Sequence, residues 1–325
     1  MGRILVIITT LLVAQFQGVV PADENKLFDT TSWLKSLRSS ADSLRWSDEA
    51  IQHGWRLQRQ PGTENYRVLD PKENTLCSGD ADECHEAFVD LMKTNKNVQV
   101  SGSTVIVLHG LGRGRQSMEP LVNHLRDSLR SSILSFGYAS TKAHISEHGQ
   151  ALANVVSGLS NSTHISFVGH SLGNLVIRSW LSQASDESLE KLCRVVMLGP
   201  PNQGSDLAKK ASKIWILKTF SQGAAKDLLI DWDNVSASLP APPCSFGIVA
   251  GGKNDSHGFS ALLDGDDDSV VRVAETRLSG STATMIVPVR HNDMMQSPTV
   301  QDAVTAFLLT GQFPDQKKED RHGPQ

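Results

Sequence analysis

The sequence predicts an α/β fold in which a mostly parallel central sheet carries helices on both faces. Three features lead to this prediction. Apolar runs alternate with amphipathic stretches from Ser103 onward, the turn Gly-His-Ser-Leu-Gly follows one of these runs at residues 169–173, and His291 lies between the last apolar run and the last helix. Repeated strand–helix units of this kind form parallel sheets that are covered on both sides.

The composition is that of a soluble globular enzyme. Of the 325 residues, 39% are hydrophobic and 20% are charged, and the formal net charge is −4. A slightly acidic chain without a basic stripe has no general attraction to nucleic acid. No Cys-x-x-C pair indicates zinc and no acidic run has EF-hand spacing, so we expect no metal and no cofactor. We also expect a monomer.

Residues 1–22 have the pattern of a signal peptide. Arg3 precedes an apolar run at residues 4–14, and small residues provide a cleavage site near Ala22. The run is short for a membrane span, and an uncleaved anchor or a buried helix is the alternative. A signal peptide indicates a secreted or periplasmic location, where disulfides form. Four cysteines allow three pairings. Cys77 and Cys84 form the natural local pair, which leaves Cys193 with Cys244; four reduced thiols are the alternative.

Residues 23–100 are expected to form an N-terminal extension packed on the main domain. Alternating residues at 55–59 and 66–69, with Pro61-Gly62 between them, predict a β-hairpin. Helices are expected at 31–44 and 83–92, and this region shows no motif with an evident chemistry.

The main domain is expected over residues 101–313, followed by a polar tail at 314–325. Its strands are predicted at 104–108, 132–136, 165–168, 194–198, 246–250 and 285–289. Its helices are predicted at 118–129, 144–159, 172–183 and 300–309.

An insertion at residues 201–243 follows the strand at 194–198, which is the sixth strand predicted. The apolar run from Ile214 to Leu217 is continuous, so its side chains cannot all lie on one face of a helix. Either the insertion is a lid that covers substrate and transiently contacts a lipid surface, or it is a structural helix at the edge of the sheet. We favour slightly a substrate-covering helix without strong interfacial activation, with Trp215 and Leu217 as substrate contacts.

Ser171 is the predicted nucleophile. A short apolar strand precedes it and a helix follows it, as a Gly-x-Ser-x-Gly nucleophile elbow requires. A serine hydroxyl needs a base and an orienting acid, which follow it in the order acid, then histidine, in this kind of fold. His291 directly follows the last strand and is the predicted base. Asp268 is the preferred acid within a run of aspartates, with Asp267 and Asp266 as alternatives.

An oxyanion hole needs two backbone N–H groups. One is predicted at Leu172, directly after the nucleophile, and the other at Leu111, in the glycine-rich loop after the strand at 104–108. His109 in the same loop precedes the serine in the chain, and we interpret it as a structural histidine.

Together these motifs resemble the α/β-hydrolase family, and within it the secreted bacterial lipases and esterases. The resemblance covers residues 103–310 and depends on the segments 107–112, 169–173 and 197–205. The segment 268–271 is similar to the family's Asp-Gly-x-Val acid loop, with Ser269 in place of glycine. The family also implies that the strands after Cys193 and Cys244 are neighbours, so that both cysteines lie at the edge opposite the active site.

The resemblance implies hydrolysis of small-molecule or lipid esters through an acyl-enzyme, without a cofactor. Thioesterases and acyltransferases use the same groups and are alternatives. A catalytically silent binding module on the same fold is a further alternative. The presence of an elbow, a base and an acid argues against the silent module.

Overall fold

The structure is a computed structural model that describes residues 44–94, 102–206, 223–229 and 231–315. The predicted signal peptide, the expected helix at 31–44 except its last residue, and the predicted substrate contacts Trp215 and Leu217 lie outside these ranges. Within the described ranges, none of the helices has the length and apolar character needed to cross a membrane.

The main domain is built on a six-stranded sheet whose neighbouring strands all pair in parallel. In order across the sheet, the strands are β10 (Ala283–Val287), β9 (Ser245–Gly251), β8 (Leu192–Leu198), β7 (Ser162–His170), β5 (Gly102–Leu108) and β6 (Ser132–Phe136). The predicted fold class is therefore confirmed. From β5 the chain builds outward first through β6 and then, on the other side, through β7. Open α/β sheets bind ligands where the strand order reverses in this way.

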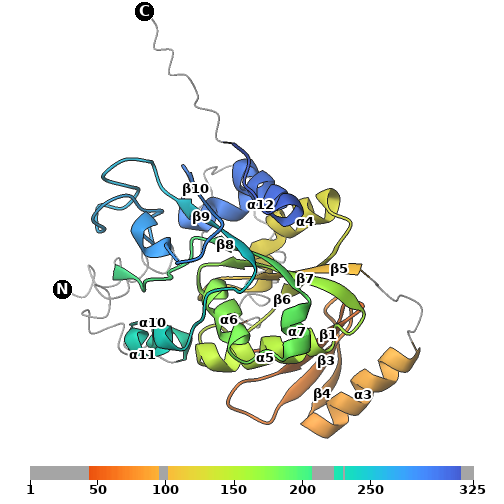
Figure 1. Ribbon diagram of the computed structural model, residues 1–325. Coiled ribbons are helices and arrows are strands. Elements are labelled where there is room, and N and C mark those ends of the chain that lie inside the picture. The colour runs from red at the N-terminus through yellow and green to blue at the C-terminus, as the bar shows by residue number, and fades with distance from the viewer. Residues whose placement is uncertain (1–43, 95–101, 207–222, 230, 316–325) are drawn as a thin grey trace, which may run out of the picture.

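Helices cover both faces of this sheet (Figure 1). On one face lie α5 (Ile145–Ser157) and α6 (Leu172–Leu181), and on the other lie α4 (Glu119–Ser128) and α12 (Pro298–Thr310). Successive side chains of a strand point to opposite faces. In β5, Ile106 and Leu108 accordingly join the core under α5 and α6, whereas Val105 and Val107 join the core under α4 and α12.

The other described helices of the main domain are shorter than these four. They are α7 (Asp186–Glu190), α10 (Ala224–Leu229) and α11 (Trp232–Ala237), with 3₁₀ turns η1 (Arg115–Met118), η2 (Val273–Thr276) and η3 (His291–Gln296). Most element boundaries differ from the prediction by one to three residues. The helix expected at 118–129 begins as η1 and continues as α4, and the strand expected to reach Val289 ends at Val287. Pro288 has no N–H for the ladder, which accounts for the earlier end of the strand.

The N-terminal extension is a four-stranded antiparallel sheet rather than the single hairpin predicted. Its strands are β1 (Ser47–Gln52), β2 (Trp55–Arg59), β3 (Tyr66–Leu69) and β4 (Thr75–Gly79), and α3 (Ala81–Thr94) packs on it. β1 and β4 are added to the predicted strands, so among the described residues the insertion follows the eighth strand and not the sixth. The prediction missed β1 because it carries a buried aspartate, and β4 because much of that strand is exposed.

Asp48 in β1 joins the extension to the main domain. Its backbone N–H donates to Gly137 O at 2.8 Å, and its carboxylate accepts the Gly137 N–H at 2.6 Å. The same carboxylate accepts hydrogen bonds from Arg56 Nη1 at 2.5 Å and from Gln58 Nε2 at 2.7 Å, and Asp48 is fully buried. A buried charge is tolerated when it is paired and hydrogen-bonded in this way. β1 thereby lies against the segment that follows β6.

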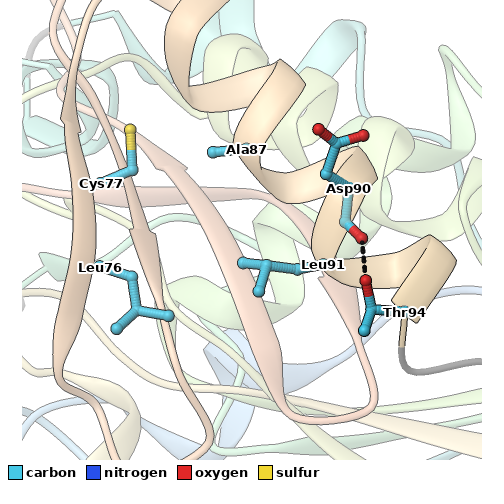
Figure 2. A pocket seen from close by; sticks show the side chains of 6 residues that line it. All are labelled: Leu76, Cys77, Ala87, Asp90, Leu91 and Thr94. Atoms are coloured by element: carbon cyan, nitrogen blue, oxygen red, sulfur yellow. Dashed lines mark hydrogen bonds between the residues drawn. The ribbon is translucent and has the colours of Figure 1, made fainter.

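A pocket lies between β4 and α3 of the extension. Figure 2 shows Leu76 and Cys77 on the strand facing Ala87 and Leu91 on the helix. Leu76 is 53% exposed, so the pocket has an apolar rim. None of the predicted site residues lines it.

The four cysteines are free thiols in the structure. The sulfurs of Cys77 and Cys84 lie 3.0 Å apart. Cys193 and Cys244 directly precede the register pair Arg194 and Ser245 of the neighbouring strands β8 and β9. The predicted placement of these two strands is therefore correct, and both disulfide pairings stay predictions.

Candidate active site

Ser171 occupies a strained turn between β7 and α6. Its φ is +53° and its ψ is −120°, a conformation that non-glycine residues rarely adopt and that clusters at functional sites. The glycines on either side allow it. A Cβ atom at Gly169 would lie 2.4 Å from Asn174 Oδ1, and one at Gly173 would lie 2.8 Å from Leu108 O. The motif therefore lets α6 approach the end of β5 closely.

Backbone and side-chain amide hydrogen bonds fix the turn at Ser171 to the end of β8. Ser171 N–H donates to Leu198 O at 2.9 Å, which ties the elbow to the end of β8. Asn174 Nδ2 donates to Ser171 O at 3.0 Å and to Leu198 O at 3.2 Å. Asn174 is fully buried in the first turn of α6. The sequence analysis missed this residue, although a polar side chain on a helix that is otherwise buried was a possible signal.

His291 and Asp268 form a close pair at the ends of β10 and β9. His291 Nδ1 lies 2.6 Å from Asp268 Oδ2, and His291 N–H donates to Asp268 O at 2.7 Å. Asp268 Oδ1 accepts the N–H groups of Val270 at 2.9 Å and Val271 at 2.7 Å. Both residues of the pair are buried. Since the carboxylate engages Nδ1, Nε2 is the imidazole nitrogen left for proton transfer.

The neighbouring aspartates have other partners. Asp266 accepts the N–H groups of Lys253 at 2.7 Å and Asn254 at 2.9 Å. Asp267 accepts those of Ser260 at 3.0 Å and Ser269 at 2.6 Å, and its burial raises its pKa. Both carboxylates thus shape the loop, whereas Asp268 contacts the imidazole.

The rings of His291 and His170 connect the pair to the nucleophile. Their centroids lie 4.6 Å apart, and His170 Nε2 lies 3.0 Å from His291 O. His170 immediately precedes Ser171, so His291 lies beside the elbow. Within the described ranges, no hydrogen bond joins Ser171 Oγ to His291. Such bonds are often long before substrate binds.

The loop after β5 forms a tight turn beside the nucleophile. Arg113 N–H donates to Gly110 O at 3.3 Å, which places Leu111 and Gly112 at the corner. A Cβ atom at Gly110 would lie 3.2 Å from the Cβ of Ser171, so the turn is packed against the elbow. Leu111 N–H has no acceptor in the described part of the chain. Leu172 is the first residue of α6, where N–H groups have no acceptor within the helix.

His109 supports this turn from beneath. Its ring is fully buried and stacks on Tyr138 with centroids 4.2 Å apart. Tyr138 Oη donates to His109 O at 2.5 Å, and Gly112 N–H donates to Ser140 Oγ at 3.1 Å. Burial lowers the pKa of His109 to about 4, so its ring is neutral near pH 7. A structural role for His109 agrees with these contacts.

Arg178 on α6 holds both ends of the insertion. Its guanidinium donates to Asn202 Oδ1 at 3.2 Å, to Pro240 O at 3.0 Å and to Leu239 O. Burial lowers the pKa of Arg178 to about 10. A second attachment lies at α10, where Asp227 accepts the Ile145 N–H at 2.7 Å. The sequence analysis singled out neither Arg178 nor Asp227.

Part of the chain is similar in sequence to a known protein family. Residues 103–218 match the model of the family described as "Putative serine esterase (DUF676)". The match covers a little over a third of the chain, and it includes the turn at Leu111 and the elbow at Ser171 but not Asp268 or His291. No curated protein matches the chain in sequence.

Solved structures of lipases and esterases are similar to this chain. The Bacillus licheniformis lipase BlEst2 in its propeptide form is 16% identical, with a TM-score of 0.51 over 69% of this chain and 53% of that one. Its mature form is 17% identical, with a TM-score of 0.49 over 67% and 95%. The Pyrococcus furiosus esterase Pf2001 is 15% identical, with a TM-score of 0.46 over 83% and 94%. The fold is that of an α/β-hydrolase, and residues 103–218 are similar to the serine esterases of the matched family.

The acid loop contains a second strained residue, which leads to a prediction about stability. Ser269 has a φ of +89°, and its Oγ is buried without a hydrogen-bond partner among the described residues. Ser269→Gly should remove both the backbone strain and the unpaired buried hydroxyl, and it should raise the free energy of unfolding by about 0.5 to 1 kcal/mol. Urea denaturation monitored by circular dichroism measures the change.

Ser238→Gly is the matched control for this substitution. Ser238 has a φ of −92° and its Oγ donates to Val235 O at 2.7 Å, so glycine there should destabilise. If both variants lose stability equally, the positive φ of Ser269 carries no measurable strain.

Proposed function

We propose that this protein is a secreted serine hydrolase that cleaves acyl or lipid carboxylic esters through an acyl-enzyme. One observation carries the proposal. The strained Ser171, the His291–Asp268 pair and the turn at Leu111 meet at the carboxyl ends of neighbouring parallel strands. The family match over the elbow supports the same reaction class.

In the proposed reaction, Ser171 Oγ attacks the carbonyl carbon of the ester. His291 Nε2 accepts the hydroxyl proton as the bond forms. Asp268, hydrogen-bonded to Nδ1 at 2.6 Å, stabilises the resulting imidazolium. The N–H groups of Leu111 and Leu172 donate to the oxygen that becomes negatively charged.

Collapse of this intermediate breaks the bond to the alcohol. His291 gives its proton to the departing oxygen, and the acyl group stays on Ser171 as an ester. Water then attacks this ester with His291 again as the base, which releases the carboxylic acid and restores the serine. The enzyme needs no redox group or metal for this sequence of steps.

Replacement of the nucleophile gives the first test. Ser171→Ala should lower kcat for p-nitrophenyl butyrate by on the order of 10⁴ to 10⁶, because the variant lacks the hydroxyl that forms the acyl-enzyme. The variant should also resist labelling by a fluorophosphonate. Ser182→Ala, at the exposed end of the same helix, is the control. A folded Ser171→Ala enzyme with a tenth of the wild-type activity would contradict the proposal.

Replacement of the aspartates gives the second test. Asp268→Asn should lower kcat by at least about 100-fold, because the amide no longer stabilises the imidazolium or fixes its tautomer. Asp266→Asn and Asp267→Asn alter loop contacts alone, so their main effect should be on thermal stability. Initial rates and melting temperatures of the three variants separate the two effects. A larger rate loss for Asp267→Asn would assign the acid one position earlier.

We further propose that residues 1–22 direct export and that the cysteines pair as Cys77–Cys84 and Cys193–Cys244. The 3.0 Å distance between the first two sulfurs and the neighbouring strands after the second two support these pairs. The second bond would close a loop that contains the insertion and contribute roughly 4 kcal/mol of stability.

Mass spectrometry of unreduced peptides from the exported protein tests the pairing. A peptide pair that links Cys193 to Cys244 is expected. A link between Cys77 and Cys193, or four alkylatable thiols, would contradict it.

A further inference from the structure

Arg113 extends from the turn at Leu111 to the loop that carries His291. Its backbone closes that turn through the 3.3 Å hydrogen bond to Gly110. Its Nη2 donates to Asn292 Oδ1 at 3.2 Å, and Asn292 directly follows His291. The guanidinium therefore lies at the rim of the site, between the proposed oxyanion donors and the proposed base.

The positive charge of Arg113 is poorly compensated by the protein. The side chain is half-buried, and desolvation lowers its pKa. Asp293 attracts the charge, but Arg113 makes no ion pair within 4.0 Å among the described residues. A guanidinium has five N–H donors, and among the described residues one of them has a protein acceptor.

Three other buried or partly buried arginines of this protein have their charge or their donors better satisfied. Arg115, two residues further along, pairs with Glu73, and Arg56 pairs with Asp48. Within the described part of the chain, Arg178 has no carboxylate partner but donates to three oxygens. Arginine forks match carboxylate and phosphate groups and bind them with short, charge-assisted hydrogen bonds. A half-buried arginine with free donors beside a reaction centre is thus suited to bind an anionic group.

We propose that Arg113 is a substrate-binding residue that selects esters with a negatively charged group, a carboxylate or a phosphate, close to the scissile carbonyl. This inference rests on the proposed ester hydrolysis at Ser171. The remaining guanidinium donors bind the anion while Nη2 stays on Asn292. Neutral esters bind at the same place without this contact, so they are poorer substrates.

Two pairs of substrates test the selection and locate the charge. On the acyl side, p-nitrophenyl butyrate is compared with the p-nitrophenyl monoester of succinic acid, which adds a carboxylate. On the alcohol side, dibutanoylglycerol is compared with its 3-phosphate. The measured quantity is the ratio of kcat/KM between the charged and neutral members of each pair. Wild-type enzyme should prefer the charged member in at least one pair.

Arg113→Gln removes the charge and keeps a side-chain amide that can donate hydrogen bonds. It should reduce the charged-to-neutral ratio by about 10- to 100-fold in the preferred pair, as expected for loss of a charge-assisted hydrogen bond. Arg113→Lys should retain part of the preference. Arg126→Gln is the matched control, because Arg126 also donates to an asparagine Oδ1, that of Asn123 at 3.4 Å, on the exposed side of α4. It should leave the ratio unchanged.

The outcomes separate this inference from the proposed function. If neutral esters are hydrolysed by the wild type and not by Ser171→Ala, the proposed function is supported, independently of the results for the Arg113 variants. Absence of any preference for charged esters in the wild type, or an equal loss on charged and neutral esters in Arg113→Gln, would overturn the role of Arg113. If Arg113→Gln does not fold, inhibition of wild-type butyrate hydrolysis by succinate and by inorganic phosphate gives an independent readout. Competitive inhibition by at least one of them is then required.

Discussion

The conformation of Ser171 is the constraint on which the rest of the site depends. A positive φ at this residue reverses the chain within one turn, and α6 then returns directly over the end of β5. The contact is close enough that a side chain at Gly173 would collide with Leu108 O. Because β5 ends there, its following turn is forced against Ser171. One strained residue thereby fixes the positions of the nucleophile and of both N–H donors relative to each other.

The acid and the base are assembled separately, on the other half of the sheet. Asp268 is held by the N–H groups of Val270 and Val271, and His291 is bound to Asp268 through both its ring and its backbone. These bonds make the pair one unit at the ends of β9 and β10. Its position against the elbow follows from the parallel register of β7, β8 and β9. Two direct contacts also join the halves of the site, because His170 Nε2 lies 3.0 Å from His291 O and Arg113 Nη2 donates to Asn292 Oδ1 at 3.2 Å.

The sequence predicts the central sheet well because buried parallel strands are continuous apolar runs. β6 was placed at its observed bounds, and β5, β8 and β9 within two residues. β1 is not predicted from the sequence, because the burial of Asp48 depends on partners that are distant in the chain. In the site, the local motif identifies Ser171, whereas Asn174 and Arg178 have partners that are distant in the sequence, Leu198 for the first and Asn202, Leu239 and Pro240 for the second. Among the aspartates, contact with His291 distinguishes Asp268, and no local pattern encodes that contact.

The bonds of Arg178 have a consequence for how this fold can change. Asn202, where the insertion leaves the domain, and Leu239 and Pro240, where it returns, are all held by one side chain on α6. When the two ends of a segment are fixed, doubling its length costs only about 0.6 kcal/mol in closure entropy. The length of the segment between these anchors can therefore vary, provided that Arg178, its three acceptors and the hydrogen bond of Asp227 to Ile145 are retained.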